Sequence, residues 1–308
     1  MRRDLANLSS AWAPAKVNLY LEVGPPRGNG RHPLDSLVMF ADTRAADRIS
    51  ARPAADISMS LDGPGAGALR NEPNNMVLKA AYALREAAGL SGVGASLGLH
   101  KTLPTAAGIA GGSADAAATL RVLNQLWELG FADAALEALA ADLGSDTPAC
   151  FRAQPAVMRG TGEMLSAAAA PDLPIVLANP GVAVSTEAVY KRFDKLRGGA
   201  SFKEAPSPEY SSERSIAEFV KALQARRNDL EPAATTLSSP IKQVLATLES
   251  QDGVLLSRMS GSGATCFGIF ETEDAAQNAA SAIAKKKSKW WVCASKLRGS
   301  VAAQPERL

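Results

Sequence analysis

The spacing of apolar residues along the chain switches between two periods, one typical of strands and one typical of helices. In residues 12–23, Val17, Leu19, Leu21 and Val23 alternate with polar positions, and this period of two predicts a strand. Further apolar alternations or runs predict strands at residues 37–40, 57–61, 95–101, 175–178 and after 264. A spacing of three to four residues predicts helices at residues 80–89, 116–127, 131–143 and from 185 onward. The mixture indicates an α+β fold class, with polar residues 203–214 as an exposed excursion.

A stretch of small residues, 105–113, comes directly before the helix predicted at 116–127 and contains nothing larger than one Ile. Small residues let a ligand approach the backbone, and a helix that starts there directs free N–H groups and the positive end of its dipole toward one point. This arrangement suits a phosphate group. No Gly-Lys-Ser or Gly-Lys-Thr follows, so it is not a Walker A loop. A tight turn with Ser113 as N-cap and no ligand stays open as the alternative.

Composition narrows the class of protein. The 308 residues exceed the usual size of one domain, and a shift to alanines and a proline near residues 167–172 predicts domains at 1–166 and 167–308 around one cleft. The net charge of +2 predicts no general attraction to nucleic acid or membranes. Three separated cysteines and two histidines argue against zinc. No apolar run is long enough to span a bilayer, so we expect a cytoplasmic protein with reduced thiols.

Three motifs in order carry a resemblance to a known family. Leu103-Pro104 leads into small residues and then Gly111-Gly112-Ser113-Ala114-Asp115, while residues 14–19 read PAKVNL and residues 259–264 read MSGSGA. Together they resemble the GHMP kinase superfamily. The resemblance implies two domains, a ribosomal S5 domain 2-like N-terminal domain that binds ATP and a ferredoxin-like C-terminal domain. The third motif is expected to close the far wall of the cleft.

Within the superfamily, residues 30–34 (GRHPL) and 143–148 (LGSDTP) resemble the kinases of the non-mevalonate isoprenoid pathway. This implies transfer of phosphate from ATP, with Mg²⁺, to the 2-hydroxyl of a cytidylyl-methylerythritol. The resemblance leaves the metal ligands open. It implies nucleotide contacts from the small-residue stretch and two flanking residues: Pro104, Thr105, Ala106, Ala107, Gly108, Ile109, Ala110, Gly111, Gly112, Ser113, Ala114, Lys101 and Asn75.

The resemblance also assigns the chemistry to two side chains. Asp146 is expected to be the general base that takes the proton of the acceptor hydroxyl. Lys16 is expected to place its ammonium between the nucleophile and the γ-phosphate, where a point charge stabilises the transferring group. The alternatives are an N-cap at Ser145 or Asp146 before Thr-Pro and an ordinary surface lysine at a strand start.

Substrate contacts are implied for Asn18, Arg31, His32 and Thr186. In this family a Tyr-His pair grips the cytosine ring, but Arg31 occupies the Tyr position here; a planar guanidinium can also stack on a base. Asn75 and Thr186 could equally be helix caps. Asp115, predicted at the second position of its helix, must point away from the phosphates or face magnesium.

Two other functions stay open from the sequence. Another GHMP kinase, acting on homoserine, mevalonate or a sugar, would share the glycine-rich loop but lack the segment around His32. A nucleotide-binding regulator would keep the loop without chemistry, although Lys16 and Asp146 in their motifs argue against it. The oligomeric state is open between a monomer and a weak homodimer.

Overall fold

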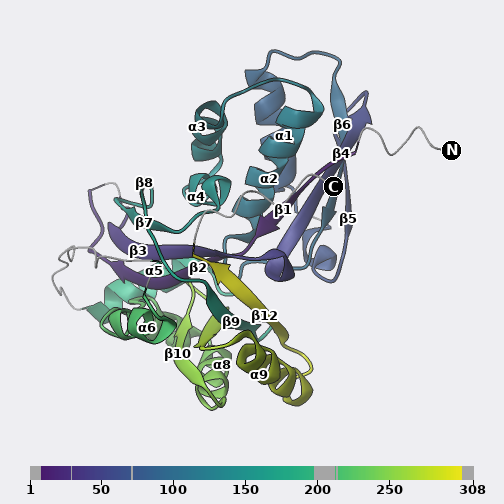
Figure 1. Ribbon diagram of the computed structural model, residues 1–308. Coiled ribbons are helices and arrows are strands. Elements are labelled where there is room, and N and C mark those ends of the chain that lie inside the picture. The colour runs from purple at the N-terminus through teal and green to yellow at the C-terminus, as the bar shows by residue number, and fades with distance from the viewer. Residues whose placement is uncertain (1–7, 29, 71, 198–211, 213, 300–308) are drawn as a thin grey trace. The chain divides into compact units, whose positions relative to one another are not determined.

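The computed structural model describes residues 8–28, 30–70, 72–197, 212 and 214–299 (Figure 1). The chain packs into two compact units that are discontinuous in sequence. Unit 1 contains Met1–Ala15, Ala46–Thr105 and Ala110–Arg152, and unit 2 contains Lys16–Ala45, Ala106–Ile109 and Ala153–Leu308. This grouping follows packing rather than chain order, and the predicted linear domains 1–166 and 167–308 stay a prediction. Most of the predicted excursion at 203–214 lies outside the described residues.

Unit 1 is a sheet with helices packed against it. Its strands lie in the order β1-β4-β6-β5, antiparallel except for the parallel pair β5–β6. The strands are β1 (Ser9–Pro14), β4 (Ala46–Ala54), β5 (Ser58–Asp62) and β6 (Gly94–His100). The helices are η2 (Ala66–Leu69), α1 (Met76–Ala87), α2 (Gly111–Leu126), α3 (Asp133–Leu143) and α4 (Thr147–Arg152). The α2 helix packs on β1, β4 and α1, and its positions Ala116, Leu120 and Leu123 are buried, as the spacing predicts.

Unit 2 is built on an eight-stranded sheet in the described part of the chain, in the order β10-β11-β9-β12-β3-β7-β8, with β2 paired to β3. Its strands are β2 (Lys16–Val23), β3 (Leu34–Ala41), β7 (Ala156–Arg159), β8 (Met164–Ala167), β9 (Leu173–Asn179), β10 (Val254–Met259), β11 (Cys266–Phe270) and β12 (Trp291–Arg298). Its helices are η1 (Thr43–Ala45), α5 (Thr186–Arg197), α6 (Ile216–Gln224), α7 (Glu231–Leu237), α8 (Ser239–Glu249) and α9 (Glu273–Lys286). Apolar side chains of α5, α7, α8 and α9 join those of β9 and β11 in one core.

The predicted single strand at residues 12–23 is wrong. It is two strands, β1 and β2, separated at Ala15 and belonging to different sheets. Pro14 ends β1, since it has no N–H to continue a ladder. The other predicted strands and helices overlap observed ones, whereas β4 was not predicted, because Arg48, Arg52 and Pro53 interrupt its apolar alternation.

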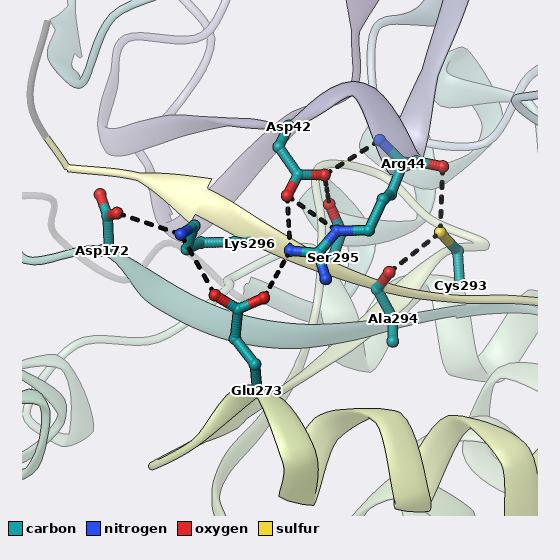
Figure 2. Close-up of polar contacts among 8 residues, drawn as sticks. All are labelled: Asp42, Arg44, Asp172, Glu273, Cys293, Ala294, Ser295 and Lys296. Atoms are coloured by element: carbon teal, nitrogen blue, oxygen red, sulfur yellow. Dashed lines mark hydrogen bonds and ion pairs between the residues drawn. The ribbon is translucent and has the colours of Figure 1, made fainter. Parts of the chain in front are cut away.

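Charged side chains reinforce the junction between β3 and β12, whose pairing in the described residues is two positions long. Figure 2 shows Arg44 between Asp42 and Glu273, with Nη2 2.6 Å and 2.9 Å from their carboxylates, and Lys296 Nζ 3.1 Å from Glu273. Burial alone would raise the pKa of Asp42, but the bonds from Arg44 outweigh burial and lower it. Burial also raises the pKa of the Cys293 thiol beside this network to about 11, so the thiol stays protonated at neutral pH.

Among the described residues, the helices are too short or too polar to reach across a bilayer.

Candidate active site

The glycine-rich stretch forms a loop in which every second residue adopts a left-handed backbone. The φ angles are 49° at Ala106, 73° at Gly108 and 51° at Ala110, while Ala107 and Ile109 between them are 4% and 0% exposed. Alanine rarely adopts positive φ, so the surrounding structure must hold this conformation. The loop therefore has a fixed backbone, and its left-handed positions, which alternate with the buried ones, carry no large side chain.

The loop runs directly into α2, whose first residue is Gly111 and whose N-cap is Ala110. The alternative in which Ser113 is the N-cap is wrong, because the helix begins at Gly111 and its N-cap is Ala110. Without a capping side chain on Ala110, the first N–H groups of α2 have no partner within the helix. They are available to an anion at the end of the loop.

Residues 106–109 belong to unit 2, and three of their backbone carbonyls accept hydrogen bonds from other residues of that unit. The carbonyl of Ala107 accepts a hydrogen bond from the N–H of Thr265 at 3.1 Å, that of Gly108 from Ser260 Oγ at 3.0 Å, and that of Ile109 from the N–H of Lys16 at 3.0 Å. A Cβ atom on Gly108 would lie 2.4 Å from the carbonyl oxygen of Ser260, so the close approach requires glycine. The predicted third motif, residues 259–264, thus lies against the loop.

Lys16 and Asn18 lie on β2, where the sequence predicted them on one face. Both are buried, with 3% and 4% exposure, so Lys16 is not an ordinary surface lysine. The side-chain amide of Asn18 donates to Ser36 Oγ at 2.8 Å, which fixes its orientation on the sheet.

Lys101, predicted as a nucleotide contact, lies between two buried carboxylates. Its Nζ is 2.5 Å from Asp47 Oδ2 and 2.6 Å from Asp115 Oδ2. The other oxygen of Asp47 accepts from the N–H groups of Thr102 and Leu103 at 2.6 and 2.8 Å. This geometry gives Lys101 a role in holding the start of the loop, and its contact with a nucleotide stays a prediction.

Asp115 is the fifth residue of α2 rather than the second, and it points into unit 1 toward Lys101. Its side chain is 3% exposed, and its Oδ1 is buried without a hydrogen bond. Burial raises the pKa of Asp115 to about 7; Lys101 opposes this effect and the charge of Asp47 adds to it. The carboxyl is therefore part of the support of the loop.

Two other predicted residues lie at helix starts. Asn75 caps α1, since its Oδ1 accepts from the N–H of Val77 at 2.9 Å, which confirms the capping alternative. Asp146 is half-buried in the turn between α3 and α4, and its backbone carbonyl accepts from the N–H of Cys150 at 3.0 Å. The catalytic role of Asp146 and a contact of Asn75 with adenine stay predictions.

His32 lies in an aromatic setting. Its Nδ1 is 2.8 Å from the carbonyl of Gly24, its Nε2 is 3.5 Å from Asp194, and its ring centroid is 4.9 Å from that of Tyr190. Sequence reasoning missed Tyr190. The signal available was one aromatic residue on the helix predicted from residue 185.

The remaining predicted contacts lie at the surface. Arg31 is exposed, and its carbonyl accepts from the N–H of Arg27 at 2.8 Å. Thr186 is the first residue of α5, with its hydroxyl 2.9 Å from that of Ser262. The structure therefore brings Thr186 to the third motif. Within the described ranges, His, Cys, Asp and Glu form no group of three or more that could hold a metal ion.

Comparison with known proteins places the chain in one family. The family model described as GHMP kinases N terminal domain matches residues 75–154, and that described as GHMP kinases C terminal matches residues 209–289. The chain is 49% identical over 292 residues to the 4-diphosphocytidyl-2-C-methyl-D-erythritol kinase of Hyphomonas neptunium, covering 94% of this chain and 96% of that protein. It is 44% identical to the kinase of the same name from Cereibacter sphaeroides, covering 95% and 100%.

Comparison with solved structures supports the same family. The crystal structure of a 4-(cytidine 5'-diphospho)-2C-methyl-D-erythritol kinase matches with a TM-score of 0.74 and 32% identity, covering 94% of this chain and all of that chain.

Proposed function

Because the chain belongs to the GHMP kinases, in the family of the 4-diphosphocytidyl-2-C-methyl-D-erythritol kinases, we propose that it phosphorylates the 2-hydroxyl of that compound with ATP. This reaction is a step of the non-mevalonate isoprenoid pathway. The observation that carries the proposal is the 49% identity to a kinase of this name, spread over 94% of the chain. An identity confined to the glycine-rich loop would support nucleotide binding alone.

The loop fits the polyphosphate of ATP. Its left-handed positions Ala106, Gly108 and Ala110 leave the backbone accessible, and α2 follows with N–H groups that its N-cap side chain does not satisfy. We propose that residues 104–114 contact the nucleotide and that residues 108–113 among them hold the β- and γ-phosphates, with the dipole of α2 favouring their negative charge. Mg²⁺ bound to the phosphates would neutralise further charge, and such ions need only one or two protein carboxylates.

The chemistry itself depends on positioning and charge rather than on a covalent intermediate. Asp146 accepts the proton from the acceptor hydroxyl, and for that its carboxylate must come within about 3 Å of the hydroxyl oxygen. The ammonium of Lys16 stabilises the charge on the transferring phosphoryl group. Lys16 is 3% exposed, so its side chain is enclosed by the protein rather than extended into solvent, which suits a point charge that must keep a fixed place.

We assign the cytosine end of the acceptor to the side chains around His32. An imidazole beside the ring of Tyr190, 4.9 Å between centroids, offers both hydrogen bonding and an aromatic face to a base. Arg31 adds a guanidinium that can stack. Asn18 and Thr186 complete the predicted contacts with the acceptor.

The experiment is an ADP-release assay with a panel of acceptors: 4-diphosphocytidyl-2-C-methyl-D-erythritol, homoserine, mevalonate and galactose. We expect turnover with the cytidylyl compound only. Turnover with another acceptor would indicate a different GHMP kinase, and ATP binding without ADP release would indicate a regulator.

The same assay tests the two catalytic assignments. Asp146→Asn and Lys16→Ala should each lower kcat by about 10² to 10⁴-fold, with ATP affinity nearly unchanged. Asp142→Asn, at an exposed position of α3, is the matched control and should keep full turnover. Wild-type turnover in Asp146→Asn would remove the general-base assignment.

A further inference from the structure

The edge of β2 that faces away from β3 is bound by four separate partners. The N–H of Lys16 donates to Ile109 and that of Leu21 to Arg227. The two other donors are Asn18, to Ser260 Oγ at 3.1 Å, and Val23, to Asp229 Oδ2 at 2.8 Å. The register shift of β2 against β3 between Asn18 and Tyr20 explains why the donors change from even to odd positions. The strand that carries Lys16 is therefore positioned by loops on this edge.

Ser260 is the partner that joins this edge to the glycine-rich loop. Its hydroxyl accepts from the N–H of Asn18 at 3.1 Å and donates to the carbonyl of Gly108 at 3.0 Å. A hydroxyl has one donor and two acceptor sites, so one oxygen atom makes both bonds without conflict. These two bonds connect a strand position two residues after Lys16 with the middle of the predicted phosphate loop.

Ser260 is itself held rigidly. It is 0% exposed, its N–H donates to the carbonyl of Thr265 at 3.0 Å, and its carbonyl accepts from the N–H of Gly263 at 3.0 Å. The side-chain amide of Asn228 donates to the carbonyls on either side, Met259 and Gly261, both at 2.8 Å. A rigid support of this kind can fix the spacing of the two elements that it joins.

We propose that Ser260 is a positioning residue for phosphoryl transfer, which sets the place of Lys16 relative to the phosphates held by the loop. This inference rests on the proposed function. Removing the hydroxyl leaves the N–H of Asn18 and the carbonyl of Gly108 without a partner, so strand and loop can shift independently. Because the hydroxyl is buried and both of its hydrogen bonds go to backbone groups of the protein, its loss should affect the chemical step more than binding.

The test is Ser260→Ala, with Ser295→Ala as matched control. Ser295 is 1% exposed and donates to Asp42 Oδ1 at 2.9 Å, so its loss also removes one buried hydroxyl from unit 2. We expect kcat of Ser260→Ala to fall about 10- to 100-fold, as for a misplacement of the order of 1 Å, while the Kd of ATP and the KM of the acceptor change less than about threefold. An equal kcat in Ser260→Ala and Ser295→Ala would overturn the proposal.

Amide hydrogen exchange gives a second readout that needs no turnover. The N–H of Asn18 should exchange faster in Ser260→Ala than in Ser295→Ala, and equal exchange rates would also overturn the proposal. If Ser260→Ala does not fold, Ser260→Cys replaces the hydroxyl by a weak donor and the same outcomes apply. An inactive wild type in the acceptor assay would refute the proposed function, whereas an active wild type with unchanged Ser260→Ala would refute only this inference.

Discussion

The buried carboxylates beside Lys101 predict that the protein loses stability as the pH rises from 5 to 8. Burial raises the pKa of Asp115 from 3.8 to about 7, with Lys101 opposing and Asp47 adding to the effect. In the unfolded chain this carboxyl titrates near its ordinary pKa of about 3.9. Between these two values the folded protein holds a proton that the unfolded chain has released. The free energy of unfolding that this proton contributes is present at low pH and is lost as the pH rises through about 7.

The size of the effect follows from the two pKa values of Asp115. One pKa unit corresponds to about 1.4 kcal/mol, and integrating the proton difference from pH 5 to pH 8 gives a loss of about 2 to 3 kcal/mol. This is a sizeable part of the roughly 5–15 kcal/mol that stabilises a typical protein. Asp115→Asn cannot ionise, so the variant should lack this contribution. It should become more stable relative to wild type by about the same amount over that interval.

The assay is urea unfolding of wild type, Asp115→Asn and Asp142→Asn at pH 5 and pH 8. Asp142 is exposed on α3, so its variant should follow wild type at both pH values. Contributions to stability that wild type and Asp115→Asn share cancel in the difference between them. If that difference is the same at pH 5 and pH 8, Asp115 does not have a raised pKa and the reasoning fails.

Two further substitutions test the support of the glycine-rich loop. Gly108→Ala should abolish most turnover and lower the free energy of unfolding by about 2–4 kcal/mol. The reason is that φ is 73° and the new Cβ would lie 2.4 Å from the carbonyl oxygen of Ser260. ADP release and urea unfolding measure both effects, with Gly67→Ala as the control, because a Cβ there would have nothing within 4 Å. Asn228→Asp should cost about 2–4 kcal/mol, since a carboxylate cannot donate to the two carbonyls that the amide now binds. Unfolding no different from that of Asn278→Asp, at an exposed position of α9, would contradict this.

Local pattern was sufficient to predict the small-residue loop and the helix that follows it. The run of small residues before Ala116, Leu120 and Leu123 predicted a tight backbone leading into an amphipathic helix, and the structure has both. These features depend on neighbours within one or two turns of the chain. The resemblance to the GHMP kinases, confirmed by the family models, likewise rests on short motifs and their order.

The features that the sequence did not reveal depend on distant partners. Lys101 lies against Asp47, 54 positions away in the chain, and no local pattern distinguishes such a lysine from one that contacts a ligand. The N-cap of α2 is Ala110 rather than Ser113, and Ala110 has a left-handed conformation that alanine does not favour. Tyr190 lies on α5 and contacts the ring of His32, which comes from the segment before β3, 158 positions earlier in the chain.

The division of the chain into units explains why the residues of the glycine-rich loop must be small. Residues 106–109 pack with unit 2, whereas the segments before and after them, up to Thr105 and from Ala110, pack with unit 1. The loop is thus fixed at its start by Asp47, which accepts from the N–H groups of Thr102 and Leu103, and at its middle by Ser260. A side chain at Gly108 would have to displace backbone atoms of the third motif. Since packed backbone cannot accommodate a methyl group without strain, packing against the third motif requires small residues here even before any phosphate binds. The small residues that this packing requires also leave the backbone open to a phosphate.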